Sequence, residues 1–322
     1  MKRVLLLLFA AILGCSRKAE TPAPHRLTPV SVNLNPSLTY APIMIAKDEG
    51  FFADEGIDLQ LASLDSNSGL AALVAGKLDV LSTGVRAGIF NMIRRGVPIA
   101  IVADKSHSSA HGCSAEAFAA SPEMARRIAA KGSLRGERLA VVRGGVGEYL
   151  MAMLLERYKA TEKDVVLVQM PQGSPITSGQ ELDAVRYLAE PHLSSMTAAG
   201  TVQRVATSDE VAPGHLSTVI VYGKRMLRDD PELGRRFMRA YLRGVRRFSE
   251  GKSDRNVAIL ARWTKMTPEE IRAACWFTAA QDGRVDPRSA QPFLDWALEK
   301  HYLDGPIAPS AWWNPAFVDA VR

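Results

Sequence analysis

The sequence lacks three motifs that are common in hydrolases and nucleotide-binding enzymes. It contains no G-x-S-x-G nucleophile elbow, no H-E-x-x-H zinc motif and no phosphate-binding loop ending in Gly-Lys-Ser/Thr. Its six histidines are scattered, and none lies in a recognisable triad. Because triads are assembled in space, these absences exclude little by themselves. Together with the export signal and the two-lobe pattern described below, they favour binding without catalysis.

Long apolar runs are also missing, except at the very start of the chain. Residues 4–13 are apolar and follow Lys2 and Arg3, a run too short to span a bilayer but typical of a secretory signal. The run ends in Ile12-Leu13-Gly14-Cys15, which resembles the bacterial lipobox. We therefore expect residues 1–14 to be a signal peptide and Cys15 to be lipidated. An ordinary signal followed by a chance cysteine is the alternative.

A strong charge of either sign is absent as well. Removal of Lys2 and Arg3 with the signal lowers the formal net charge from +6 to +4 and leaves 308 residues, enough for two domain-sized cores. So small a net charge does not indicate nucleic acid as a partner, and no RNA- or DNA-binding motif is present. Residues 15–27, with prolines and mixed charges, read as a lipidated, flexible tether.

Cysteine is scarce. With Cys15 used by lipid, Cys113 and Cys275 remain, and we expect two separate thiols. A bond between them is the alternative; since we place them in different lobes, it would lock closure. His107, His111 and Cys113 have a spacing that a soft metal could use, but no fourth ligand is evident. A polar loop with a small buried cysteine is the favoured interpretation, and we predict no metal and no cofactor.

The stretch from Tyr40 to Leu61 is the most informative part of the chain. Pro42 suits a first helical turn, where its missing N–H costs nothing, and Gly50 can end the helix in the left-handed conformation. After Gly56, apolar and polar residues alternate as in a strand. A helix that leads into a strand is the unit of an α/β sheet. We place the ligand at the N-terminus of this helix, beside Tyr40 and Asn35.

Further helix and strand signals alternate up to residue 103. We predict a helix capped by Asn67 or Ser68, a strand at 78–81, a helix at 86–95 and a strand at 97–103. Such alternation implies a mostly parallel sheet, in which ligands bind at the carboxyl ends of the strands. Ser82 and Thr83 lie at one such end and could hold an anion or an amide. The polar residues 105–112 read as a crossing into a second lobe.

The second lobe is indicated by a strand at 139–142, a glycine loop and a helix at 148–158. Gly144 and Gly145 precede the helix and could bind negative charge or carbonyl groups, whereas a tight structural turn is the alternative. The spacing of the glycines is not that of a dinucleotide site. Strands follow at 165–170 and 184–190, the latter ending in Glu190-Pro191. A β-branched strand at 218–222 brings the chain back.

Helices dominate the rest of the chain. Apolar residues recur every three or four positions from Leu233 to Phe248, with arginines on much of the other surface. We interpret the arginines as a solvated basic face; contact with a permease or with anionic lipid is the alternative. Thr267 begins a capping box, and the later tryptophans are assigned to core packing.

The motif YAPIMIAKDEGFF at 40–52 resembles the opening of the ABC-transporter solute-binding proteins for nitrate, sulfonate, taurine and thiamine-pyrimidine precursors. Residues 70–104, residues 134–171 and the turn Ala189-Glu190-Pro191 follow that family's order and spacing, so the resemblance covers nearly all of the mature chain. In many relatives an aromatic residue precedes the glutamate, which often faces the cleft. Here Ala189 precedes it, which leaves no stacking platform at that point.

The resemblance implies a two-lobed periplasmic-binding-protein fold of type II, with two α/β domains joined by a hinge of two crossovers near 105–113 and 213–219. Lobe 1 would comprise residues 28–108 and 218–322, and lobe 2 residues 109–217. The ligand would lie between the lobes. The expected ligand-binding residues are Asn35, Tyr40, Ser82, Thr83, Gly144, Gly145 and Glu190.

The resemblance also implies the function. We expect the solute-binding component of an ABC importer, acting on the periplasmic side of a bacterial membrane as a monomer with a permease and its ATPase. Its ligand would be either a small organic anion such as a sulfonate, or a pyrimidine-like heterocycle that donates to Glu190. The alternative is an enzyme of the same fold that resembles those making the thiamine pyrimidine, against which the export signal argues.

Overall fold

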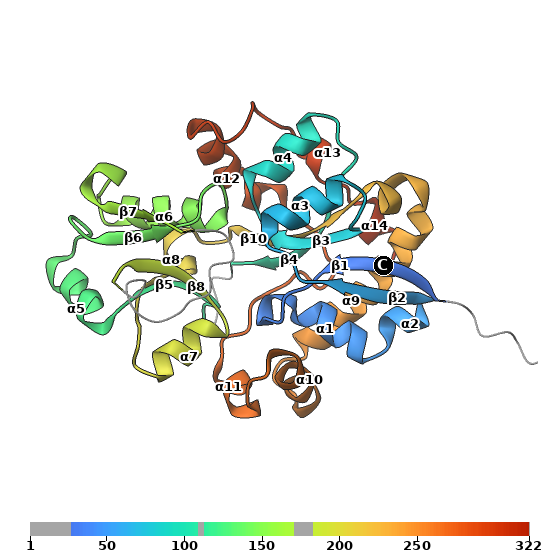
Figure 1. The fold of residues 1–322 in the computed structure, drawn as a ribbon, viewed down its shortest axis with the longest axis horizontal. Helices are drawn as coiled ribbons and strands as arrows, with labels where there is room; N and C mark the ends of the chain where they lie inside the picture. The colour runs from blue at the N-terminus through green and yellow to red at the C-terminus, as the bar shows by residue number, and fades with distance from the viewer. Residues whose placement is uncertain (1–26, 109–112, 171–182, 322) are drawn as a thin grey trace, which may run out of the picture.

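The computed structural model describes residues 27–108, 113–170 and 183–321. Within these ranges the chain forms two separate five-stranded sheets, each with helices packed on it (Figure 1). The signal peptide, the tether, Cys15 and His111 lie outside the described residues, so the predictions made for them stay predictions.

The first sheet has the strand order β2-β1-β3-β10-β4. Its strands are β1 (Thr28–Asn33), β2 (Ile57–Ala62), β3 (Val80–Gly84), β4 (Ala100–His107) and β10 (Leu216–Tyr222). β1 runs parallel to β2 and β3, whereas β10 is antiparallel to β3 and β4, between which it lies. The predicted return strand is therefore confirmed, and the returning chain completes the sheet that the first hundred residues began.

Two of the predicted element boundaries in this sheet are wrong. Helix α3 (Ser66–Val74) is capped by Asp65, whose side chain accepts hydrogen bonds from the backbone of Asn67 and Ser68, the two residues that we had expected to cap it. Strand β4 begins and ends later than predicted and includes Lys105, which we had assigned to a polar crossing. Its pairing with β10 contains register shifts, and such irregularity removes the period of two by which a strand is recognised.

Helices cover both faces of the first sheet (Figure 1). The predicted helix from Pro42 is α1 (Ala41–Asp48), preceded by a short 3-10 turn, η1 (Leu38–Tyr40), and followed by Gly50 in the left-handed region with a φ of 79°. The other helices of this part of the chain are α2 (Phe51–Asp54), α4 (Ala87–Arg94), the short π-helix η4 (Arg225–Asp229), α9 (Pro231–Ser249), α10 (Asp254–Thr264), α11 (Pro268–Ala273), α12 (Pro287–Glu299), α13 (Pro309–Trp312) and α14 (Ala316–Asp319). The capping box of Thr267 at α11 is confirmed.

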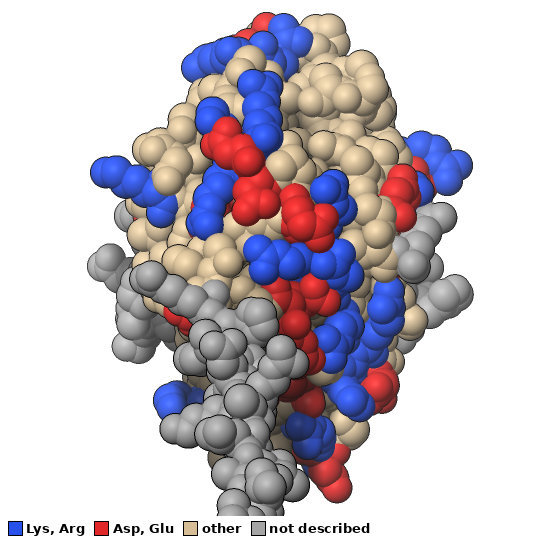
Figure 2. All heavy atoms as spheres, turned by 90° about the vertical axis from the view of Figure 1, so that its right-hand side faces the viewer, with Lys and Arg blue, Asp and Glu red and all other residues tan. Residues whose placement is uncertain are grey.

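The apolar stripe of α9 is buried as predicted, but its arginines are not simply solvated. Arg239 pairs with Glu55 at 2.9 Å, and Arg243 pairs with Asp54 at 2.9 Å while its guanidinium lies 4.0 Å from the ring centroid of Phe51. Figure 2 shows the side of the molecule on which α2 and β2 lie, with basic and acidic side chains interleaved along a band. The acidic residues around α2 thus neutralise part of the basic face.

The second sheet has the order β7-β6-β8-β5-β9. Its strands are β5 (Glu116–Ala120), β6 (Arg138–Val141), β7 (Val166–Gln169), β8 (Val185–Ala189) and β9 (Gln203–Thr207), and its helices are α5 (Pro122–Lys131), α6 (Val146–Arg157), η2 (Glu162–Asp164), α7 (His192–Ala198) and α8 (Ser208–Val211). β6 is parallel to β7 and β8, whereas β5 is antiparallel to β8 and β9.

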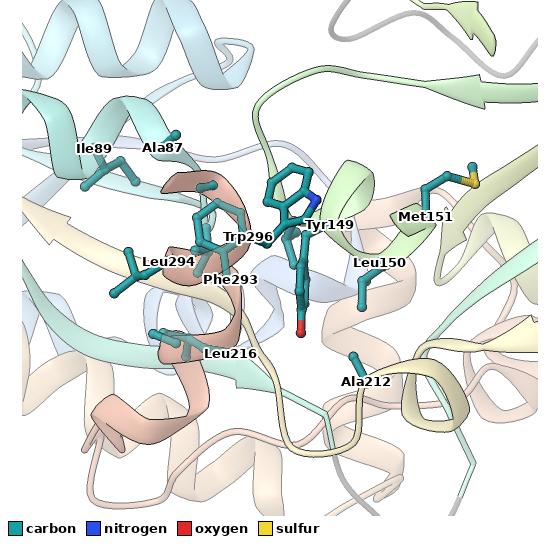
Figure 3. Packing of buried hydrophobic residues seen from close by; sticks show 14 of the residues in the cluster. Ala87, Ile89, Tyr149, Leu150, Met151, Ala212, Leu216, Phe293, Leu294 and Trp296 are labelled. Carbon is teal, nitrogen blue, oxygen red and sulfur yellow. The ribbon is translucent and has the colours of Figure 1, made fainter. Parts of the chain in front are cut away.

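Two connections join the sheets. β4 leads towards β5, and the chain after α8 returns to β10; the two run close together, since the backbone N–H of Ser108 donates to the carbonyl of His215 at 2.9 Å. The sheets are also held together by the C-terminal region. Tyr149 on α6 packs edge to face with Phe293 and Trp296 on α12, at centroid distances of 5.9 and 5.8 Å (Figure 3). A helix from the C-terminal region thus covers a helix of the second sheet.

Candidate ligand-binding site

The first group of candidate site residues comes from three elements of the first sheet. Tyr40 lies in η1, Ser82 near the carboxyl end of β3 and Lys105 on β4. The Tyr40 hydroxyl donates to the Ser82 carbonyl at 3.2 Å, and Lys105 Nζ donates to Ser82 Oγ at 3.0 Å while lying 3.8 Å from the centroid of the Tyr40 ring. All three are buried. We call Tyr40, Ser82 and Lys105 the Lys105 cluster; the sequence pointed to two of its members and missed the lysine.

Asn35 and Thr83 are both held by neighbouring loops. Asn35 donates to the Leu64 carbonyl at 3.0 Å and accepts from Ser63 at 2.6 Å, while Thr83 donates to Ser66 at 3.1 Å. Burial raises the pKa of Tyr40, and a hydrogen bond with Asn35 opposes that rise. Asn35 therefore stands at the edge of the Lys105 cluster, and Thr83 faces the start of α3.

The glycine loop of the second sheet lies directly against the first sheet. Gly144 has a φ of 76°, and its N–H donates to Glu148 Oε2 at 2.6 Å, while Arg143 Nη1 lies 2.6 Å from Glu148 Oε1. The Gly144 carbonyl accepts from Ala87 N at 3.1 Å, and Gly145 forms a bridge with Arg86. The N–H of Gly144 thus donates to a carboxylate of the helix that follows it, α6. The loop also joins the two sheets, and its predicted contact with an anion stays a prediction.

Glu190 is buried and accepts three hydrogen bonds from protein groups. Ser194 donates through its backbone N–H at 3.0 Å and its hydroxyl at 2.6 Å, and the backbone N–H of Cys275 donates at 3.2 Å. Its carboxylate therefore caps α7 and ties it to the segment that follows α11. Protein donors thus use most of the acceptor capacity of this carboxylate, and its predicted contact with a ligand stays a prediction.

Cys113 and Cys275 are joined by a disulfide, 162 residues apart in the sequence. The prediction of two separate thiols is therefore wrong. The bond links the segment before β5 to the segment after α11, next to the contact between Glu190 and the Cys275 backbone. It also removes Cys113 as a thiolate ligand for metal, and the neighbouring His107 instead pairs with Asp104 at 2.9 Å.

A second group of buried polar residues joins β5 and β8 of the second sheet to the start of β10. It was not identified from the sequence. Glu116 on β5 accepts from the Ser217 hydroxyl at 2.8 and 3.0 Å, and its Oε2 lies 3.7 Å from His215 Nε2. Tyr187 on β8 interacts with the same carboxylate and helps to lower its pKa. We call Glu116, Tyr187, His215 and Ser217 the Glu116 cluster. The Tyr187 hydroxyl and His215 Nε2 are buried without a hydrogen-bond partner in the described structure.

The two clusters act on each other electrostatically. Burial lowers the pKa of Lys105 to about 7, while the negative charge of Glu116 partly opposes that shift. Burial also acts to raise the pKa of Glu116, but the interactions with His215, Tyr187 and Ser217 together outweigh it and leave the pKa lowered. A buried amine on the first sheet and a buried carboxylate on the second thus act on each other, and the Tyr187 hydroxyl and His215 Nε2, which lack hydrogen-bond partners among the described residues, belong to the same cluster as the carboxylate. Buried polar atoms without partners are rare, and they mark places where a ligand can supply the missing bonds.

None of the described helices is long and apolar enough to cross a membrane.

Comparison with solved structures gives the fold. The ligand-binding component of an ABC-type import system from Staphylococcus aureus, solved with zinc bound, has a TM-score of 0.75 and 17% identity over 92% of this chain and 99% of that chain. The alkanesulfonate-binding protein SsuA from Xanthomonas axonopodis pv. citri, solved with MOPS, has a TM-score of 0.71 and 15% identity over 90% and 99%. The desulfurization enzyme DszB has a TM-score of 0.63 and 15% identity over 91% and 98%.

These likenesses confirm the predicted two-lobed periplasmic-binding-protein fold. No curated protein matches the chain. The family described as NMT1/THI5 like matches residues 37–250, which is more than half of the chain and includes both clusters. The chain therefore belongs to the NMT1/THI5-like family.

Proposed function

We propose that this protein is the extracytoplasmic solute-binding component of an ABC importer, which captures a small organic ligand between its lobes and delivers it to a permease. The observation that carries the proposal is the pair of buried polar clusters that together span the two sheets. The Lys105 cluster lies on the first sheet, and the Glu116 cluster joins β5 and β8 of the second sheet to Ser217 of the first, with the Tyr187 hydroxyl and His215 Nε2 left without hydrogen-bond partners among the described residues. Closure of two lobes around a ligand needs such groups on both sides, because the ligand must bind the closed state better than the open one.

The two sheets define the proposed lobes. We take lobe 1 as residues 28–108 with 218–322 and lobe 2 as 109–217, with the two connections as the hinge. The Cys113–Cys275 disulfide then joins the two lobes from within the connection between β4 and β5 and limits how far they can move apart. Tyr40, Ser82 and Asn35 would contact the ligand from lobe 1, while Thr83, Gly144, Gly145 and Glu190 would shape the site through the contacts described above. The protein would act as a monomer with a permease and its ATPase.

Native mass spectrometry of gently purified protein tests this proposal. We expect a small molecule to be carried along and to be released unchanged on denaturation. Added back at a hundredfold excess over its dissociation constant, it should stabilise the protein by about 2.7 kcal/mol, which calorimetry would detect as a higher melting temperature. A chain that carries nothing and is stabilised by no candidate solute would contradict the proposal.

An enzyme is the second candidate, because DszB has the same fold and because a lysine with a pKa of about 7 is chemically suited to acid–base work. The two are distinguished by incubating the recovered ligand with purified protein. Conversion that disappears in Lys105→Met would favour the enzyme, whereas unchanged ligand favours the binder.

Attachment to the membrane through Cys15 is the last part of the proposal, motivated by the Gly14-Cys15 pair after a short apolar run. Two or more acyl chains give stable anchoring, whereas one is marginal. We expect the wild-type protein to sediment with membranes and Cys15→Ser to be released or to remain unprocessed. Fractionation of intact wild-type protein as soluble and unlipidated would contradict this expectation.

A further inference from the structure

Lys105 is an unusual group to find in the interior. The residue is 1% exposed, yet among the described residues its amine has just one hydrogen-bond acceptor, Ser82 Oγ, besides the face of the Tyr40 ring. Within the described ranges it forms no ion pair. Burying a charge without a counter-charge is costly, and lysines are almost never buried unless paired.

The groups around Lys105 do not supply that counter-charge. From η1 the only titratable neighbour is Tyr40, whose raised pKa keeps it neutral. From β5, Glu116 acts on Lys105 at longer range, while its oxygens are engaged by Ser217 and lie beside His215. On its own strand, Asp104 is held by His107 and by the backbone N–H of Ala280. From β3 comes the hydroxyl of Ser82, which accepts from the amine, while the hydroxyl of Ser217 on β10 donates to Glu116.

We propose that Lys105 recognises the negatively charged group of the ligand, so that the ligand is a small anion. This inference rests on the function proposed above and chooses between the two ligand classes that the sequence left open. The anion would lie on the Tyr40 side of Lys105, where α1 begins and its partial positive charge adds to that of the amine. The opposite side is unfavourable, since Glu116 would repel it.

Binding should then be linked to a proton. Without a counter-charge the pKa of Lys105 is about 7, so the amine is mostly neutral above that pH. An anion beside it favours the ammonium form and raises the pKa, which means that a proton enters from solvent as the anion binds. The affinity for the anion should therefore fall as the pH rises above about 7.

Titration calorimetry with defined probes tests the proposal. The probes are nitrate, methanesulfonate, ethanesulfonate and MOPS, with ethyl methyl sulfone as the uncharged counterpart of ethanesulfonate and 4-amino-2-methylpyrimidine as a neutral heterocycle. We expect at least one anion to bind to the wild type, and Lys105→Met to bind it with at least tenfold lower affinity. If ethanesulfonate is that anion, the sulfone should bind at least tenfold more weakly than ethanesulfonate. Lys47→Met is the matched control, because Lys47 lies on α1, is half-buried and has one backbone acceptor, the Leu59 carbonyl. It should bind like the wild type.

The proton is measured on the wild type, so the test does not depend on a variant that folds. In buffers of different ionisation enthalpy at pH 8, the heat of binding should report uptake of more than half a proton per anion. Lys105→Arg, which keeps a charge at every pH, should bind the anion without that uptake. Without any ligand, the melting temperature of the wild type should rise relative to that of Lys105→Met between pH 7 and 10. In this range the lysine is protonated in the unfolded chain and mostly neutral in the folded protein, so folding releases a proton and becomes more favourable as the pH rises.

Three results would overturn the proposal: binding of an anion without proton uptake, equal affinity of Lys105→Met and wild type, or binding of the heterocycle alone. In the last case the protein would still be a solute-binding protein, so the proposed function would stand. If no probe binds and no ligand co-purifies, the proposed function itself fails.

Discussion

Replacing Cys113 and Cys275 together by serine is expected to lower the free energy of unfolding by up to about 5 kcal/mol. The reason is the length of chain that the bond closes. A disulfide stabilises mainly by restricting the unfolded chain, and the effect grows with loop length; 162 residues separate these two cysteines. Because the Cys275 backbone also donates to Glu190, the bond holds a contact that joins the segment after α11 to α7.

Urea unfolding with and without a reductant measures this effect. The wild type in reductant should unfold at the same concentration as the double serine variant, and the variant should be insensitive to reductant. Ser16→Ala, outside the loop, is the control and should change nothing. A wild type whose unfolding midpoint does not move on reduction would contradict the prediction. An intact bond also fits an oxidising, extracytoplasmic compartment.

Gly244→Ala is expected to destabilise the protein by about 3 kcal/mol and to weaken ligand binding as well. Gly244 is where α9 crosses α1: a Cβ there would lie 2.2 Å from the Pro42 carbonyl oxygen and 2.8 Å from Ala46 Cβ. The first obstacle is backbone, so a rotamer change cannot relieve it and the helices must separate. Inserting a methyl group into a packed interior commonly costs about 1 to 3 kcal/mol. Since α1 begins directly after Tyr40, its displacement would also shift the Lys105 cluster.

Gly88→Ala is the matched control. Gly88 also lies in a helix, α4, but the nearest atom to its Cβ is Leu70 Cδ2 at 3.2 Å, the end of a flexible side chain. Removing the conformational freedom of a helical glycine should stabilise the protein by up to about 1 kcal/mol. The melting temperature of Gly244→Ala should therefore fall below that of the wild type, whereas that of Gly88→Ala should rise above it. A Gly244→Ala protein as stable as the wild type would mean that α1 and α9 are packed less tightly than described.

Those parts of the fold that depend on local signals can be predicted from the sequence. Pro42 and Gly50 begin and end α1, Thr267 caps α11, and the β-branched run at 218–222 forms β10, because each of these depends on the backbone preferences of a few adjacent residues. The apolar stripe of α9 is a local signal of the same kind. Apolar residues that recur with the helical period of 3.6 residues predict a buried face, whichever element packs against it. Tyr40 and Ser82 were found in the same way, at the start of a helix and the end of a strand.

The other residues of the site can be identified only from the tertiary structure, because their burial and their contacts depend on residues far away in the chain. Lys105 reads as a loop residue until β10, more than 100 positions later, pairs with its strand and buries it. β5 is a short strand without alternation, and it is a strand because β8 and β9 bond to both of its edges. Cys113 has its disulfide partner in Cys275, and the backbone N–H of Cys275 also supplies a long-range hydrogen bond to the Glu190 carboxylate. A residue's type shows what it can bind, whereas burial and distant neighbours decide whether a carboxylate, an amine or a thiol is left free to do so.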